Sequence, residues 1–256
     1  MNEEDLSKQE TTPGIENQNE QLSKIEALAG VITAPSETSE TIANTPKKNY
    51  WLLPVIIFIV VNLIATFLFM SDKELVNKTM DKQKEMMREQ FDKKVKEGKM
   101  TQEDANKAME SMNPAGIFFK VIAFGGAVIG PFIMLLLLSV VFLLGLKIMK
   151  AQFDFTNVLN VVGLALLIVA LGNLISIVIS VLRGDMSTVG LGLLFSEEAV
   201  GKKAYALLTK LDVFSIWFYV VLAIGLSKIA RINMIKSASL AFGVFIVYAV
   251  VTSLLF

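Results

Sequence analysis

The chain has 256 residues, of which 54% are hydrophobic and 19% charged, and its 24 basic residues balance 24 acidic ones. Soluble domains carry about a quarter charged residues, so this composition favours a membrane protein. The chain has no cysteine and no histidine, which excludes disulfides, thiol or imidazole catalysis, and metal sites built on those side chains. We therefore expect no cofactor, no metal site and no nucleic-acid partner.

The first 46 residues form an acidic segment with nine acidic residues, two basic residues and no aromatic residue. Such a segment buries too little apolar surface to offset the conformational entropy lost on ordering. Over 1–46 we predict a disordered cytoplasmic tail, with a short helix around 22–28 as the one exception. The tail either keeps this end of the chain solvated or docks on a basic partner. Its polar start differs from the basic and then apolar pattern of a signal peptide.

Five apolar runs follow, and each is long enough to suggest a membrane-spanning helix. A bilayer core about 30 Å thick takes about 20 helical residues to cross, and backbone polar groups in lipid must be bonded internally. The predicted spans lie at about 51–70, 120–149, 157–182, 211–227 and 237–256. The second run is too short for two spans and a turn, so we predict one helix, kinked near Gly130 and Pro131. The predicted fold class is all-α, a polytopic membrane helical bundle with five transmembrane helices.

Two amphipathic segments connect the predicted spans. Residues 71–115 read as a helical hairpin broken near Gly98, with an apolar stripe at helical spacing on its first arm (Met80, Met87, Phe91 and Val95). This stripe either packs within the hairpin or on the membrane, or serves as an adaptable face for a partner. Residues 197–211 read as one interfacial helix in the headgroup plane, with Glu197 and Glu198 in its first turn.

The basic residues of the short loops predict the orientation of the chain. They lie before the first span, after the second span, and after the fourth span, where Lys228, Arg231 and Lys236 have no acidic neighbour. The positive-inside rule places these three sites in the cytoplasm. We therefore expect a protein of the cytoplasmic (inner) membrane with its N-terminus inside. The hairpin 71–115 and the C-terminus would then be extracytoplasmic.

A few polar residues in or beside the spans are candidate site residues. Asn62, Asn160 and Asn173 either line a path through the membrane or form hydrogen bonds between helices. We expect Lys120 to reach the outer interface with its side chain, and we expect Asp212 to cap the fourth span.

One glycine pair also stands out in the second span. Gly126 and Gly130 have the small-xxx-small spacing that lets another helix pack closely. That helix would belong either to this chain or to a second copy in a homo-oligomer.

A family resemblance appears around the fourth span. The chain reads Leu211-Asp212-x-Phe214-Ser215-Ile216-Trp217, then Ile224-Gly225-Leu226, then a basic turn and a last span. With the methionine-rich hairpin, this pattern resembles the bacterial branch of the Yip family, the Ypt/Rab-interacting membrane proteins, over residues 50–256. The resemblance implies five spans with a cytoplasmic N-terminus. Eukaryotic relatives are linked to Rab GTPases and membrane traffic, but their Asp-Leu-Tyr-Gly-Pro motif is absent here. We therefore do not extend GTPase binding from those relatives to this chain, and the family supplies no catalytic residue.

Three functional hypotheses are compatible with these features. The leading one is a non-enzymatic multi-pass membrane protein that contacts the bilayer and organises the membrane or partner proteins, alone or as a homo-oligomer. The alternative is a small-solute channel or transporter, based on Asn160, Asn173 and the glycine- and proline-interrupted second span. The third is a membrane enzyme that acts on lipid through carboxylates such as Asp212 or through Lys120.

Overall fold

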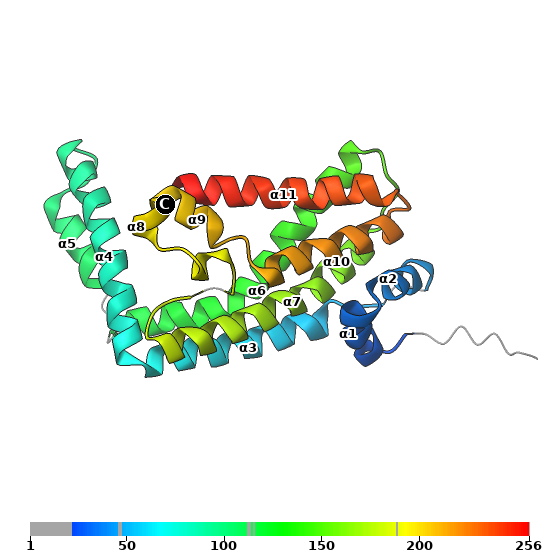
Figure 1. The fold of residues 1–256 in the computed structure, drawn as a ribbon, viewed down its shortest axis with the longest axis horizontal. Helices are drawn as coiled ribbons and strands as arrows, with labels where there is room; N and C mark the ends of the chain where they lie inside the picture. Colours follow the sequence, from blue (N-terminus) through cyan, green and yellow to red (C-terminus); the bar gives the residue numbers. More distant parts are fainter. Residues whose placement is uncertain (1–21, 46–47, 112–113, 115, 188, 256) are drawn as a thin grey trace, which may run out of the picture.

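The computed structural model describes residues 22–45, 48–111, 114, 116–187 and 189–255, and within these the fold is helical (Figure 1). The elements are α1 (Lys24–Thr33), α2 (Pro35–Asn44), α3 (Leu52–Ser71), α4 (Lys73–Lys96), α5 (Gln102–Ser111), α6 (Ile117–Ile148), α7 (Phe155–Arg183), the short 3-10 helix η1 (Leu191–Leu193), α8 (Glu197–Val200), α9 (Lys202–Leu208), α10 (Val213–Ile229) and α11 (Met234–Leu255). These described residues form no β-strand, and one isolated bridge joins Gly190 to Asp212.

Four helices, α3, α6, α7 and α11, are long and apolar enough to cross a membrane. The predicted all-α membrane bundle is therefore confirmed. The fourth predicted span, at 211–227, corresponds to α10, an apolar helix of 17 residues that extends about 25 Å. Each of the five helices begins and ends within three residues of its predicted span.

The long second run forms one helix, as predicted, rather than two. α6 continues through Pro131 for 32 residues, which corresponds to about 48 Å. This length exceeds a hydrocarbon core of about 30 Å, so α6 must tilt or extend past the core. Between Lys120 and Lys147 its exposed surface is apolar, with side chains such as Val121 and Leu137 about three-fifths exposed.

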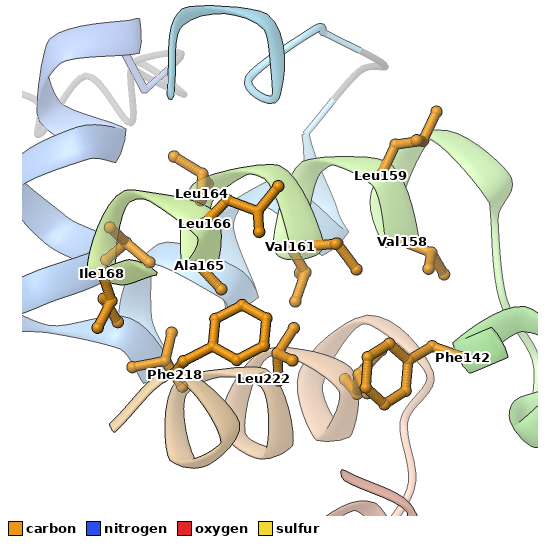
Figure 2. Close-up of a cluster of buried hydrophobic side chains, with 14 of the residues drawn as sticks. Phe142, Val158, Leu159, Val161, Leu164, Ala165, Leu166, Ile168, Phe218 and Leu222 are labelled. Carbon is orange, nitrogen blue, oxygen red and sulfur yellow. The ribbon is translucent and has the colours of Figure 1, made fainter. Parts of the chain in front are cut away.

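Helix α7 forms the centre of the bundle. It contacts α3, α6 and α10, together with the two N-terminal helices. Fifteen of its 29 residues are buried, including the whole stretch from Val158 to Ile168. A helix that is apolar all round is suited to this central position. Figure 2 shows side chains of this stretch meeting Phe218 and Leu222 of α10.

Close helix contacts occur at glycines other than the predicted pair. An added Cβ at Gly163 would lie 2.5 Å from Cβ and 2.7 Å from Cα of Trp51, and one at Gly172 would lie 2.8 Å from Cβ of Phe214. At Gly126 and Gly130 an added Cβ would meet open space. The prediction that these two glycines pack closely is therefore wrong for contacts within this chain, because that side of α6 faces no described helix.

The N-terminal segment contains two packed helices. Helix α1 begins with a capping box, in which the Glu26 N–H donates to Ser23 Oγ at 3.1 Å and the Ser23 N–H donates to Glu26 Oε2 at 2.7 Å. Ala27 and Val31 of α1 and Ile42 of α2 are buried against the bundle. The short helix predicted around 22–28 is the start of α1, and the prediction of a disordered tail is wrong for residues 29–44. The low average hydrophobicity concealed a few apolar side chains that dock on α7 and α10, while residues 1–21 lie outside the described residues.

The bundle has two distinct ends (Figure 1). Helices α1 and α2 lie at one end, close to the turn between α10 and α11. The hairpin α4–α5 lies at the opposite end and runs across the direction of the bundle, with α8 and α9 beside it. Polar elements therefore cover both ends of an apolar helical body.

Candidate functional site: two cavities at the hairpin end

Asn160 fixes the start of α3. Its Oδ1 accepts hydrogen bonds from the backbone N–H groups of Tyr50 at 2.9 Å and Trp51 at 3.2 Å, and its Nδ2 donates to the Lys48 carbonyl at 2.8 Å. The side chain is 1% exposed. Because all three partners are backbone groups of one segment, Asn160 has a structural role and does not line a path.

Asn62 and Asn173 meet between α3 and α7, although 111 positions separate them in sequence. Asn173 Nδ2 donates to Asn62 Oδ1 at 3.2 Å, linking α7 to α3. Both amides line a cavity of about 420 Å³ between α3, α6 and α7. Thr66, Ser176 and Ser180 add hydroxyl groups to its wall. We call this space the amide cavity.

The loop after α7 folds back over the last turn of that helix. Gly184, at φ +64°, ends α7, and the Ser187 N–H then donates to Ser180 Oγ at 2.9 Å. Ser180 in turn donates to the Ser176 carbonyl at 2.8 Å. These bonds place Met186 and Ser187 at the mouth of the amide cavity.

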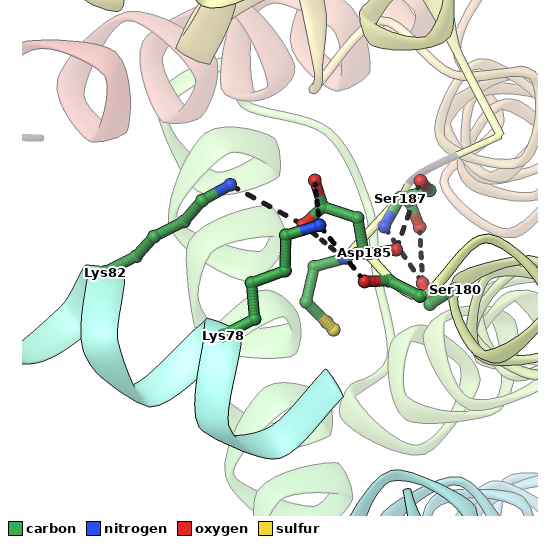
Figure 3. A network of polar contacts seen from close by, with 7 residues as sticks. Lys78, Lys82, Ser180, Asp185 and Ser187 are labelled. Atoms are coloured by element: carbon green, nitrogen blue, oxygen red, sulfur yellow. Dashed lines mark hydrogen bonds and ion pairs between the residues drawn. The ribbon is translucent and has the colours of Figure 1, made fainter. Parts of the chain in front are cut away.

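Two lysines of α4 hold this loop against the hairpin (Figure 3). The Lys78 and Lys82 ammonium nitrogens lie 3.6 Å and 3.5 Å from the carboxylate oxygens of Asp185. Lys78 also donates to the Gly184 carbonyl at 3.3 Å. Such exposed ion pairs contribute little stability, about 0–1 kcal/mol each, and they link α4 to the loop after α7.

A larger cavity of about 770 Å³ lies on the other side of Met186 and Ser187. Charged side chains of both signs line it: Lys82, Arg183 and Lys202 are basic, and Asp185, Glu197 and Glu198 are acidic. Phe195 and Tyr205 contribute aromatic side chains to its wall. We call this space the charged cavity.

The interfacial segment differs from the prediction. Residues 197–211 form two short helices, α8 and α9, rather than one. The break lies at Gly201, whose φ of +79° is incompatible with a right-handed helix. Leu194 and Phe195, just before α8, are exposed by 74% and 45%, as expected for a segment in contact with lipid.

The other two predicted polar residues, Asp212 and Lys120, do not line either cavity. Asp212 caps α10, where its Oδ1 accepts from the backbone N–H groups of Phe214 and Ser215, both at 2.9 Å. Its second oxygen accepts from the Ser215 hydroxyl. Lys120 is exposed in the first turn of α6 and forms no ion pair with the described part of the chain.

The apolar stripe of the hairpin faces inward. Met80 and Phe91 are 3% and 8% exposed, whereas Met87 and Val95 are half-buried. Phe91 lines a shallow cavity between α4 and α5 together with Ala105, which is also buried. Met80 and Phe91 are therefore not available as a partner or membrane face, because packing against the rest of the chain already covers them.

Comparison with known proteins identifies the family. A family model for the Yip1 domain matches residues 29–255. The chain belongs to the Yip1 family. It is also similar to a protein named membrane protein YknW from Bacillus subtilis (strain 168), with 25% identity over 236 residues and 90% of each chain covered. No solved structure matches the chain.

The limits of the Yip1 match agree with the fold. The match begins at residue 29, inside α1, whereas the sequence resemblance covered only residues 50–256. Helix α2 and the second half of α1 are therefore part of the Yip1 domain rather than of a separate tail. The protein is a multi-pass membrane protein of this family.

Several residues around the two cavities were not predicted from the sequence. Asp185, Ser187 and Lys78 lie in polar segments without a motif, so the sequence offered no signal for them. Gly184 directly after Arg183 is different, since a glycine after a basic last turn is a common end of a helix. That signal predicts the turn, although not the cavities beside it.

Proposed function

We propose that this Yip1-domain protein is a non-enzymatic membrane scaffold whose hairpin α4–α5 presents a polar surface to a partner protein. The observation that carries the proposal is the hairpin itself. It projects at one end of the bundle, is held by Lys78 and Lys82 on Asp185, and turns its apolar side chains inward. Its exposed surface is rich in charge, including Arg88, Lys93 and Lys96.

The polar groups of the described chain support a structural rather than a chemical role. Asn160 holds backbone groups and Asp212 caps a helix. Among the described residues, no three acidic side chains come together as metal ligands would. The proposal therefore assigns the protein no reaction.

The distribution of basic residues supports a cytoplasmic position for the α1–α2 end. The start of α3, the end of α6 and the α10–α11 turn lie at this end of the bundle (Figure 1). Lys48 precedes α3, Lys150 follows α6, and Arg231 lies in the α10–α11 turn. With the positive-inside rule, the hairpin and both cavities lie on the extracytoplasmic side of the inner membrane. The partner is then a protein of that side or an extracytoplasmic part of another membrane protein.

Photo-cross-linking in cells tests the scaffold proposal. A photoreactive residue at Lys93, exposed on α4, should cross-link to one discrete protein. The same residue at Lys203, exposed on α9 at the same end, serves as the matched control and should give no such product. Cross-links from Lys93 to lipid or to the chain itself alone would overturn the proposal.

A small-solute channel or transporter is the second candidate function. The Asn62–Asn173 pair in the amide cavity favours it, since polar side chains there meet open space between three helices. Asn160 does not support a transport function, because its side chain already forms hydrogen bonds with the backbone just before α3. Liposomes with the full chain should then pass a solute faster than empty ones, and Asn173→Leu should reduce that flux. Equal flux across a broad solute panel would exclude this candidate.

A further inference from the structure

We propose that the charged cavity and the amide cavity together bind one phospholipid with an amine-bearing zwitterionic headgroup of the phosphoethanolamine type. The headgroup would occupy the charged cavity, and the glycerol ester region would reach the amide pair. This inference goes beyond the scaffold proposal and does not depend on it.

The charges in the larger cavity match a ligand that carries both signs. Three basic and three acidic side chains line the same space of about 770 Å³. A site for a simple anion would show an excess of basic groups. A balanced set instead suits a phosphate joined to an ammonium group.

Four of these six side chains remain available to a ligand. Lys82 and Asp185 already pair with each other at 3.5 Å. Among the described residues, Arg183, Lys202, Glu197 and Glu198 form no ion pair, although they line one cavity. A phosphate on Arg183 and Lys202, with an ammonium on Glu197 and Glu198, would satisfy both sets with charge-assisted hydrogen bonds.

The walls of the charged cavity are ordered by backbone contacts. On one side, the Ser187 N–H bond to Ser180 fixes the loop after α7. On the other side, the Leu191 N–H donates to the Leu211 carbonyl at 3.2 Å. At Gly190 an added Cβ would lie 2.7 Å from Cβ of Asp212, so only glycine allows this close approach. Contacts within the chain therefore fix both walls of the charged cavity.

The position of the amide cavity beside the charged cavity favours a lipid over a soluble ligand. Met186 and Ser187 line both spaces, so the two cavities adjoin at this loop. It lies between the spanning helices α3, α6 and α7, and its wall is partly apolar, with Ala65, Ala127 and Ile177. The Asn62–Asn173 pair there offers amide groups to ester carbonyls. A headgroup with an attached glycerol ester and acyl chains fits this change from charged to apolar lining.

Native mass spectrometry of the full chain in detergent tests the site. Equal amounts of dioleoyl phosphatidylethanolamine and dioleoyl phosphatidylglycerol are added, and the lipid bound per chain is counted. The proposal predicts a clear preference for the ethanolamine lipid. Equal binding of the two lipids, or a preference for the glycerol lipid, would overturn it.

Two sets of variants distinguish the roles of the charges. The double variant Arg183→Gln with Lys202→Gln should lower binding of the ethanolamine lipid by about tenfold or more, as expected for lost hydrogen bonds to a charged group. The matched control Lys203→Gln, next in sequence but outside the cavity lining, should bind as the original chain does. Equal losses in both would overturn the assignment.

The acidic side chains should control selectivity rather than overall binding. The double variant Glu197→Gln with Glu198→Gln should lose the preference for the ethanolamine lipid and bind phosphatidylglycerol at least as well. This change of preference requires a folded protein, so misfolding cannot imitate it. An unchanged preference would show that the carboxylates do not hold the ammonium.

A soluble headgroup distinguishes the source of the ligand. Glycerophosphoethanolamine carries the same phosphate and ammonium without acyl chains. The proposal predicts that it displaces the bound lipid only weakly, because it cannot occupy the amide cavity. Displacement at the same concentration as the intact lipid would contradict a lipid site and favour a water-soluble ligand.

Discussion

Asn160 shows how one side chain determines the position of a whole helix. It satisfies two backbone N–H groups and one carbonyl just before α3, at a depth where water does not replace them. The neighbouring Gly163 lets Trp51 approach the surface of α7. The two residues lie one helical turn apart on α7 and together form the docking point for the start of α3.

Replacing Asn160 should destabilise the protein more than replacing Asn173. Asn160→Leu leaves the buried N–H of Tyr50 without an acceptor, which costs about 1–3 kcal/mol. Asn173→Leu removes one side-chain bond in a half-open cavity, worth about 0.6 kcal/mol on average in membrane proteins. Thermal unfolding of both variants in the same detergent measures the difference. Equal midpoints would contradict the structural role of Asn160.

A second comparison tests which glycines matter. Gly163→Ala places a methyl group 2.7 Å from the backbone of Trp51, and such overpacking costs about 1–3 kcal/mol. Gly126→Ala meets open space within the chain and should stabilise α6 by about 0.5–1 kcal/mol through helix propensity. The free energies of unfolding of the two variants should thus change in opposite directions. A large destabilisation by Gly126→Ala would instead place a second copy of the chain against α6.

At the scale of elements, α2 is held on the bundle by packing and by one ion pair. Ile42 is buried, and Lys228 at the end of α10 donates to Glu40 at 2.8 Å. The hydrogen bond and charge of Lys228 lower the pKa of the Glu40 carboxyl below its ordinary value of 4.5. Hydrogen bonds from Ser23 likewise lower the pKa of Glu26 in α1.

These two shifts predict a loosening of α1 and α2 in acid. A carboxyl with a lowered pKa in the folded state contributes stability above its ordinary pKa of 4.5, and this contribution is lost as the pH falls below that value. A dye on the single cysteine of Glu37→Cys should therefore show a modest drop in anisotropy below pH 4.5. Lys228→Gln should show part of that drop already near neutral pH, whereas Lys147→Gln, exposed on α6, should not. A pH-independent anisotropy would contradict this account of α2.

The sequence predicted the spanning helices because burial in lipid leaves an unmistakable run of apolar residues. It also predicted the hairpin, from the stripe that includes Phe91 and from the break at Gly98. It missed α2, because only Ile42 and two small polar residues of that helix are buried. It merged α8 and α9, because the periodicity continues across Gly201 and only the backbone shows the break.

At the scale of the whole molecule, the cavities could not be predicted, because they arise from contacts between distant segments. Asn62 meets Asn173 and Lys78 meets Asp185, each across more than 100 residues. The sequence singled out both asparagines as polar groups in apolar runs, yet it offered no means of pairing them. Asp185 lies in the loop that folds back after α7, and its contacts with Lys78 and Lys82 of α4 depend on that fold (Figure 3).

We propose that α10 crosses the membrane with the other four helices, so that the two polar ends face opposite sides. Single-cysteine variants test this directly, because the chain has no cysteine of its own. A membrane-impermeant maleimide on intact cells should label Glu89→Cys in the hairpin and Lys203→Cys in α9. It should label Glu37→Cys in α2 and Lys236→Cys in α11 only after permeabilisation. Equal labelling of Lys203→Cys and Lys236→Cys in intact cells would contradict a spanning α10 and with it the two-ended arrangement of the protein.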